Sequence, residues 1–252
     1  MRLFLSEWMK TKRTAVRWIT FFLPVLIACC VITYMMYRTD LSSDFIYEGF
    51  FTVWTAIIMP LGAGLLSGYL VHEEELAGCF NGLLNTQVSR TKLYFGKFFL
   101  LTFCMAACTL ISALVLSLGM GLLMPDRGDS SLFLLASLFA IMGVLPILAI
   151  HLWASFLWGM GASIGIGMCG ILVAALIGAT SLGNKVWMFV PWAWPVKMAM
   201  FPMIFSLSSG EIIWKTAAQF ITEIFLSIFT LILFLTGGIL WFHKWEGGKY
   251  SE

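Results

Sequence analysis

The chain has 252 residues, of which 60% are hydrophobic and 11% are charged, and its formal net charge is +2. A soluble globular protein of this size needs far more charge on its surface, so the composition excludes that class and indicates an integral membrane protein. The net charge excludes no further class, because the orientation of a membrane protein depends on where its lysines and arginines lie.

Apolar runs long enough to cross about 30 Å of hydrocarbon, as helices of roughly 20 residues, occur along the whole chain. We count six of them, at 18–36, 50–70, 98–124, 132–153, 164–182 and 220–242. The runs are continuous and do not alternate with a period of two, which favours helices over strands. The sequence therefore predicts an all-α integral membrane protein with six transmembrane helices, in which residues 1–252 form a single transmembrane domain.

The segment before the first span, residues 1–17, combines basic residues with an apolar side. Leu5, Trp8 and Met9 group together on a possible helix, which predicts an amphipathic helix lying in the membrane interface. A signal peptide is the alternative, but no A-x-A site closes the following apolar run, so we expect the segment to be retained. The residues that we assign to the interfacial helix are Glu7, Trp8, Lys10, Lys12 and Arg13.

The positions of the basic residues predict the orientation. Six spans that start from the cytoplasm place ten lysines and arginines inside and five outside. This excess agrees with the positive-inside rule, so we expect both termini in the cytoplasm. The first outer loop is acidic instead, with Asp40, Asp44 and Glu48.

Small residues four positions apart occur in two of the spans. Such spacing lets helix backbones approach closely and predicts a packing seam, although glycine is also simply common in membrane helices. The positions are Gly64 and Gly68, Gly161 and Gly165, and the series Gly170, Ala174 and Gly178.

The longest polar interval, residues 71–97, lies between the second and third spans. Leu76, Phe80, Leu83 and Leu84 recur at helical spacing, which predicts a short cytoplasmic helix whose apolar face docks onto a partner. The run Glu73–Glu75 fits ion pairs with that partner, or a helix start that favours acidic residues through the helix dipole.

Residues 183–215, between the fifth and sixth spans, are too apolar for a free loop and too broken by proline for another span. We expect one or two short re-entrant or interfacial helices, with the tryptophans at headgroup depth. Glu223 is the one acidic residue well inside a predicted span, so it is a functional candidate by default. The alternative is that the last span begins later, which would leave Glu223 near the outer interface and within reach of Lys215.

Known catalytic and metal-binding patterns do not occur in the sequence. There is no G-x-x-x-x-G-K-[ST] phosphate loop, no H-E-x-x-H and no C-x-x-C. The six cysteines are best explained as small packing residues. We therefore expect a protein that is not an enzyme and holds no cofactor or metal.

Two stretches resemble the permease subunits of ABC-2 type transporters. The first is Ser6-Glu7-Trp8-Met9-Lys10-Thr11-Lys12-Arg13-Thr14, an acidic residue and a basic cluster before the first span. The second runs from Glu73-Glu74-Glu75-Leu76-Ala77-Gly78 to Gly96-Lys97 and is similar to the family's coupling helix, which docks on the ATPase subunit. The residues that the resemblance assigns to ATPase coupling are Glu73, Glu74, Glu75, Leu76, Gly78, Phe80, Leu83, Leu84, Arg90 and Lys97.

Within that family, the size and general character of the chain resemble the permeases of lantibiotic-protection transporters. The resemblance implies an exporter in the cell membrane of a Gram-positive bacterium that expels lantibiotic peptides and so confers immunity. It implies as partners an ABC ATPase in two copies, which holds the ATP and Mg²⁺, a second related permease and membrane lipid, with no nucleic acid. Residues of a candidate substrate path are then Glu223, Trp187, Trp192, Trp194, Asp40, Asp44 and Glu48.

Two alternatives remain open on the sequence alone. The same fold could carry another cargo, such as a drug, a sodium ion or a lipid-linked glycan. An intramembrane enzyme is the other, and it requires titratable groups that converge at one depth.

Overall fold

The structure, a computed structural model, describes residues 2–12, 14–38, 41–85, 88–123, 130–184, 186–208 and 211–247. In these ranges it consists of helices and connecting turns without a strand, so the prediction of an all-α protein is confirmed.

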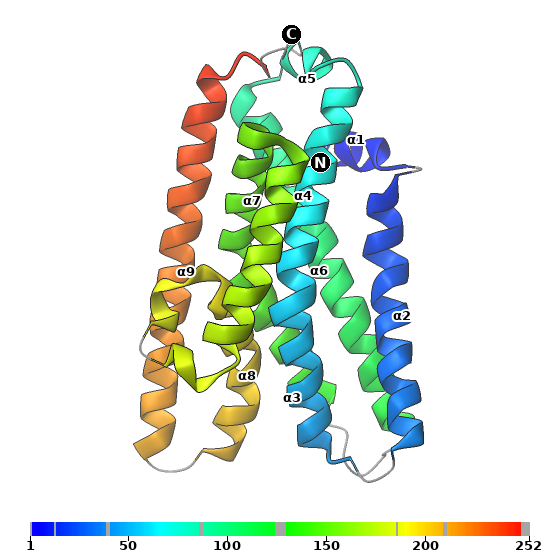
Figure 1. Cartoon of the computed structure of the whole chain (residues 1–252), viewed down its shortest axis with the longest axis vertical. Helices are drawn as coiled ribbons and strands as arrows, with labels where there is room; N and C mark the ends of the chain where they lie inside the picture. The colour runs from blue at the N-terminus through cyan, green and yellow to red at the C-terminus, as the bar shows by residue number, and fades with distance from the viewer. Residues whose placement is uncertain are drawn as a thin grey trace.

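Long helices run side by side along the molecule, and one short helix, α1 (Arg2–Lys10), lies across them (Figure 1). The long elements are α2 (Ala15–Tyr37), the rod formed by α3 (Ser43–Val53), a π-helical turn (Trp54–Ile58) and α4 (Met59–Leu76), then α6 (Arg90–Leu123), α7 (Ser130–Val173) and α9 (Glu211–Lys244). The single-turn helix α5 (Asn81–Leu84) lies at the same end of the bundle as α1. We call this end the α1 end and the other the distal end.

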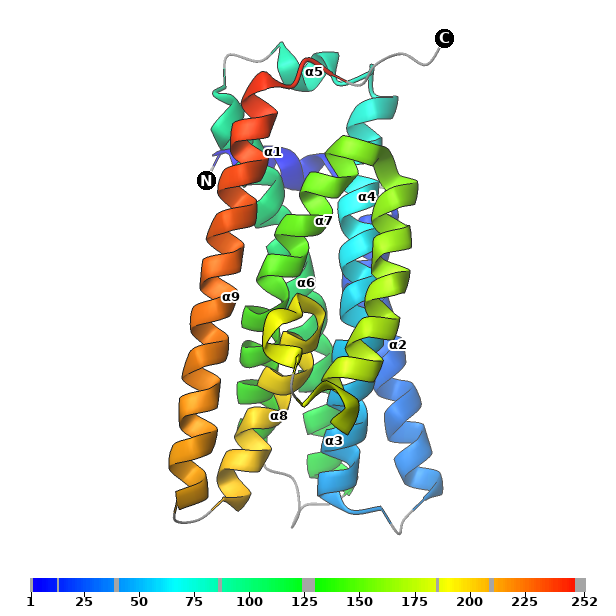
Figure 2. The same ribbon diagram turned by 60° about the vertical axis from the view of Figure 1, so that its left-hand side comes forward.

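Among the described residues, five segments are long and apolar enough to span a membrane, one fewer than the sequence predicted. The difference arises in α7, whose 44 residues would measure about 66 Å if straight, far more than a bilayer core of about 30 Å. Two helices meet in α7 at Gly159, whose φ of 80° and ψ of −176° are not helical. Figure 2 shows the chain reversing direction within α7 near the α1 end.

The segment between α7 and α9 does not cross the whole bundle but turns partway along its length. After a π-helical turn (Ala174–Gly178), three 3₁₀ turns (Ser181–Gly183, Trp187–Phe189 and Pro191–Ala193) lead into α8 (Trp194–Leu207). The turns lie near the middle of the bundle's length, and α8 runs from them to the distal end (Figure 1). Helix α9 then returns to the α1 end, and it begins nine residues before the predicted start of the last span at 220.

Glycines allow α4 and the second half of α7 to pack closely. A Cβ on Gly64 would lie 2.7 Å from the carbonyl oxygen of Ser163, and one on Gly167 would lie 2.8 Å from that of Pro60. The Ser67 and Ser163 hydroxyls are 3.0 Å apart across the same contact. The structure thus favours a seam at Gly64, within one chain, whereas a Cβ on Gly161 or Gly165 would meet nothing within 4 Å.

Gly170 and Gly178, in a second glycine series, pack against the turn before α8 and the start of α8. A Cβ on Gly170 would collide with the indole of Trp192, and one on Gly178 would lie 2.9 Å from the side chain of Val196. These two positions therefore fix the 3₁₀ turns and the start of α8 against the end of α7.

Candidate functional site

Four charged side chains from three helices meet at the α1 end, and we call them the charge network. The Lys97 ammonium of α6 lies 3.0 Å from a carboxylate oxygen of Glu7 on α1 and 2.8 Å from one of Glu74 on α4. The Lys10 ammonium lies 2.7 Å from both carboxylates. Two ammonium groups thus bridge the same two carboxylates, and α1, α4 and α6 are joined through them.

The network is buried on its inner side and open on its outer side. Lys97 is 1% exposed and Glu7 is 4% exposed, whereas about half of the Lys10 side chain is accessible. Burial alone would lower the pKa of Lys10, but the hydrogen bonds and charges of Glu7 and Glu74 outweigh it, so the pKa is raised and Lys10 stays charged. A cavity of about 300 Å³ adjoins the network, between Thr11, Thr14, Glu73 and Leu70.

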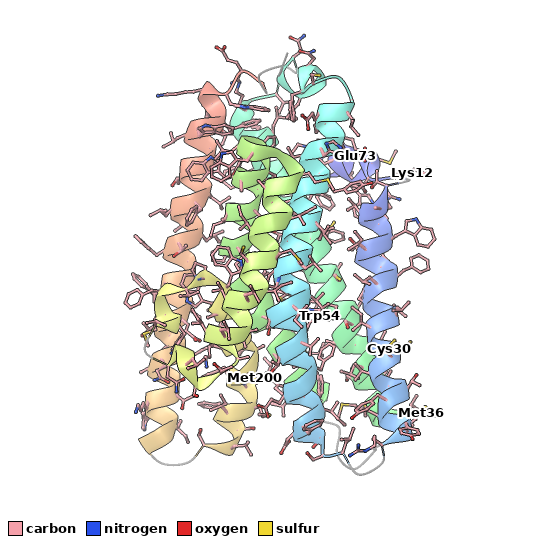
Figure 3. All side chains as sticks on the ribbon, viewed as in Figure 1. Lys12, Cys30, Met36, Trp54, Glu73 and Met200 are labelled. Atoms are coloured by element: carbon pink, nitrogen blue, oxygen red, sulfur yellow. The ribbon has the colours of Figure 1, made fainter. Side chains whose placement is uncertain are left out.

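Helix α1 is also fastened to the start of α2. The Arg17 guanidinium donates to the carbonyl oxygen of Trp8 at 2.9 Å and to the Thr11 hydroxyl at 3.2 Å, and it lies 4.7 Å from the centroid of the Trp8 ring. Lys10 and Arg17 of the N-terminal segment therefore make contacts within this chain. Lys12 is exposed at the α1 end, as is Glu73 (Figure 3), and Arg13 lies outside the described residues.

The predicted amphipathic helix at 76–84 is wrong. Helix α4 ends at Leu76, and Gly78, Cys79 and Phe80 have φ values of 123°, 50° and 64°, which no helix accommodates. The chain makes a tight turn there and then forms α5. We call residues 77–85 the coupling hairpin.

The coupling hairpin points its large apolar side chains inward. Phe80 packs edge-on against Trp245 with ring centroids 4.8 Å apart and also contacts Phe156 at 6.4 Å. Leu83 is 1% exposed, whereas Leu76 is 69% exposed. The exposed residues left for a partner are Glu73, Glu75, Leu76, Ala77, Gly78, Cys79, Asn81, Gly82 and Asn85. Leu84 belongs to α5, but its side chain lies outside what is described.

Two residues at the start of α6 hold the end of α9. The Arg90 guanidinium donates to the carbonyl oxygens of Phe242 at 3.2 Å and His243 at 2.9 Å, and also to that of Trp245. The Thr91 hydroxyl lies 2.7 Å from Nε2 of His243. The last carbonyls of a helix lack partners within it, so Arg90 caps α9. Its guanidinium therefore contacts α9 of the same chain.

The candidate residues of the substrate path do not form one group. Asp44 and Glu48 are exposed on α3, near the distal end, and Asp40 lies outside the described residues. Trp187 and Trp194 are buried, and Trp194 donates to the carbonyl oxygen of Met188 at 3.1 Å. Trp192 fills the space beside Gly170, so Trp192 and Trp194 act as packing groups within the segment.

Glu223 faces a cation that the sequence reasoning did not select. It is 4% exposed, and the positive charge that acts on it is Lys197 of α8. Lys215 is exposed and lies two turns earlier on α9, which begins at Glu211, before the predicted start of the last span. Lys197 is a lone cation within an apolar stretch, the same signal that selected Glu223.

The described residues contain no cluster of three or more His, Cys, Asp or Glu side chains that could hold a metal ion. His151 is fully buried and its Nδ1 lies 3.1 Å from the Ser163 hydroxyl, within the seam between α4 and α7. This pair joins packed helices.

A comparison with known protein families matches residues 3–174 to the family described as ABC-2 family transporter protein. This match covers more than half of the chain. The chain belongs to the ABC-2 transporter family. The matched residues include the charge network, the coupling hairpin, both sides of the glycine seam and nearly all of α1. Neither the curated proteins nor the solved structures gave a match.

Membership of the ABC-2 family makes this chain a membrane component of a transporter, compatible with a subunit that is not an enzyme. It also implies partnership with an ABC ATPase. The family match does not extend to α8 and α9, where Lys197 and Glu223 lie.

Proposed function

We propose that this chain is the permease subunit of an ATP-driven exporter, and that the exposed side of the coupling hairpin receives the movement of a separate ATPase. The observation that carries the proposal is the charge network. It ties α4, which leads into the hairpin, to α1 and to α6, which leads out of it. A push on the hairpin would then reach three helices at once.

The proposed topology has six crossings, with the two halves of α7 as the fourth and fifth. It is supported by the reversal at Gly159 and by the length of α7. The α1 end would face the cytoplasm, since most lysines and arginines lie there, and α8 would be re-entrant from the outside.

The docking surface that we propose differs from the one expected from the sequence. Phe80 and Leu83 are buried against the chain itself, so they support the hairpin from below. Leu76 and the polar residues Asn81 and Asn85 are exposed and form the surface that a partner can reach. Glu73 and Glu75 flank it and suit basic groups of an ATPase.

Lantibiotic peptides stay the proposed cargo. The proposal rests on the resemblance in the sequence and is supported only by the exposed carboxylates of Asp44 and Glu48 near the distal end, which suit a cationic peptide. Export of another cargo by the same machinery is the alternative. A second, related permease beside this chain and a Gram-positive host belong to the same prediction.

Co-expression of the chain with its ATPase and companion permease in a lantibiotic-sensitive host tests both the transport role and the cargo. The transport role predicts that the tagged chain copurifies with the ATPase and that hydrolysis needs the assembled complex. The cargo predicts survival at higher peptide doses with less peptide left on the cells. An assembled, active complex whose dose response matches the empty host would refute the cargo and leave the transport role intact.

A further inference from the structure

A polar pocket of about 320 Å³ lies between α8, α9 and the turn before α8, in the distal half of the bundle. Its volume falls within the range of small-molecule sites, roughly 300–1,000 Å³. The lining residues that bear on its contents are Asn184, Trp187, Lys197, Gln219, Phe220 and Glu223.

The two charges in this pocket do not neutralise each other by direct contact. Glu223 is buried and Lys197 is partly buried, and each feels the charge of the other. Within the described part of the chain, however, no ion pair or hydrogen bond joins them or ties either to another residue. A buried carboxylate without a direct partner is costly, so a ligand that supplies the missing cation would be favoured.

The lining offers groups that suit a cation and groups that suit an anion. Beside the Glu223 carboxylate it holds the aromatic residues Phe220 and Trp187, a residue type that attracts cations. Beside the Lys197 ammonium it holds the amide groups of Asn184 and Gln219, which can donate to a phosphate. The arrangement therefore suits a zwitterion better than a simple cation or anion.

The surroundings indicate a lipid. Glu223 lies ten residues into the candidate span Ile213–Lys244, about 15 Å along the helix from its start. On the same helix Ile221 and Phe225 are 66% and 69% exposed. These apolar side chains offer a surface for acyl chains next to the polar pocket.

We propose that this pocket binds the zwitterionic headgroup of a membrane phospholipid, with the ammonium at Glu223 and the phosphate at Lys197. The site is independent of the cargo of the exporter and of the ATPase. It lies on α8 and α9, beyond the residues matched to the ABC-2 family.

Binding is measured by native mass spectrometry on the purified, delipidated full chain, titrated with phosphatidylethanolamine or phosphatidylglycerol. The wild type is expected to bind the ethanolamine lipid at least about tenfold more tightly, since a charge-assisted hydrogen bond to Glu223 is available only to its ammonium. Equal affinity for the two lipids overturns the proposal.

Two variants and one control assign the effect to the pocket. Glu223→Gln should lose about tenfold in affinity for the ethanolamine lipid and keep its affinity for the glycerol lipid, because Lys197 remains. Lys197→Gln should weaken both lipids. Lys215→Gln, an exposed lysine on the same helix, should change neither. Ethanolamine-lipid affinity that survives both pocket variants contradicts the proposal.

A charge exchange and two competitors complete the test. The double variant Lys197→Glu/Glu223→Lys should restore the preference for the ethanolamine lipid, which keeps the proposal testable even if Glu223→Gln does not fold. Free phosphoethanolamine at millimolar concentration should not displace the lipid. Complete displacement by it would make a soluble zwitterion the occupant, and displacement by a micromolar cationic lantibiotic would make the peptide the occupant; both overturn the lipid assignment.

Discussion

Lys97 is the residue on which the charge network depends most. Of the two lysines in the network it is the fully buried one, and it contacts both Glu7 and Glu74. Removing one partner of a buried ion pair leaves the other charge uncompensated, which typically costs about 3–5 kcal/mol.

We therefore predict that Lys97→Met lowers the apparent Tm of the purified chain markedly, as measured by thermal unfolding in detergent. Lys10→Met is the matched control and should have a smaller effect, because about half of the Lys10 side chain is accessible and its ion pairs are screened by water. Equal losses for the two variants would show that Lys97 is not the centre of the network.

The sequence singled out all four residues of the network but placed them in two unrelated groups. Glu7 and Lys10 were assigned to an interfacial helix, and Glu74 and Lys97 to the contact with a partner. Nothing in local spacing shows that positions 7 and 97, ninety residues apart, share an ion pair. Hydropathy predicts that a segment crosses the membrane, but it does not predict which polar side chains meet at its end.

At the scale of elements, the coupling hairpin departs most from the sequence-based expectation. Its apolar residues fit a helical repeat, but that spacing carries no sign that the helix is interrupted at Gly78, where φ is 123°. The apolar residues are buried instead against the aromatic rings of α7 and the end of α9. Helical periodicity alone cannot distinguish a face that docks on a partner from one that docks on the chain itself.

Gly78 and Gly82 offer a matched pair of tests for the hairpin. Gly78→Ala forces an L side chain into a φ of 123°, which costs on the order of 1–3 kcal/mol locally, whereas Gly82 has an ordinary φ and open space around it. We predict that Gly78→Ala reduces ATP hydrolysis by the assembled complex several-fold and that Gly82→Ala, which adds a methyl group to the same surface without backbone strain, has a smaller effect. Full activity of Gly78→Ala would show that the hairpin's shape is not required for coupling.

The glycine seam gives a prediction for the contact between α4 and α7. Gly64→Ala places a methyl group 2.7 Å from the backbone oxygen of Ser163, so the two helices must separate, at a cost of about 1–3 kcal/mol. Gly161→Ala meets nothing within 4 Å and should be neutral or slightly stabilising. Thermal unfolding of the two variants side by side measures this; no difference between them would mean that the seam is loose.

At the scale of the whole molecule, the number of crossings and their direction decide which surface meets the ATPase. Continuous apolar runs were enough to predict an all-α membrane protein, because helices satisfy every backbone group in lipid. The boundary of the last span was less predictable. The continuous apolar run predicts a start at 220, whereas α9 begins at Glu211. Its first turns include the polar residues Thr216 and Gln219, which line the pocket shared with α8.

The native Cys79 reports the orientation, because it is exposed at the α1 end on the coupling hairpin. In a variant without the other exposed cysteines, we predict that an impermeant maleimide leaves Cys79 unlabelled in intact cells and labels it after permeabilisation. A cysteine placed at Lys215, near the distal end, should show the reverse. Labelling of Cys79 in intact cells would invert the proposed topology.

The central claim is that the ATPase contacts the exposed side of the coupling hairpin, and site-specific photocrosslinking in the assembled complex tests it most directly. A photoreactive residue replaces Asn81, which is exposed on α5, or Leu207, which is 70% exposed at the distal end of α8. The account predicts a covalent adduct with the ATPase from position 81 and none from position 207. No adduct from position 81 in a complex that still hydrolyses ATP, or an adduct from position 207, would contradict it.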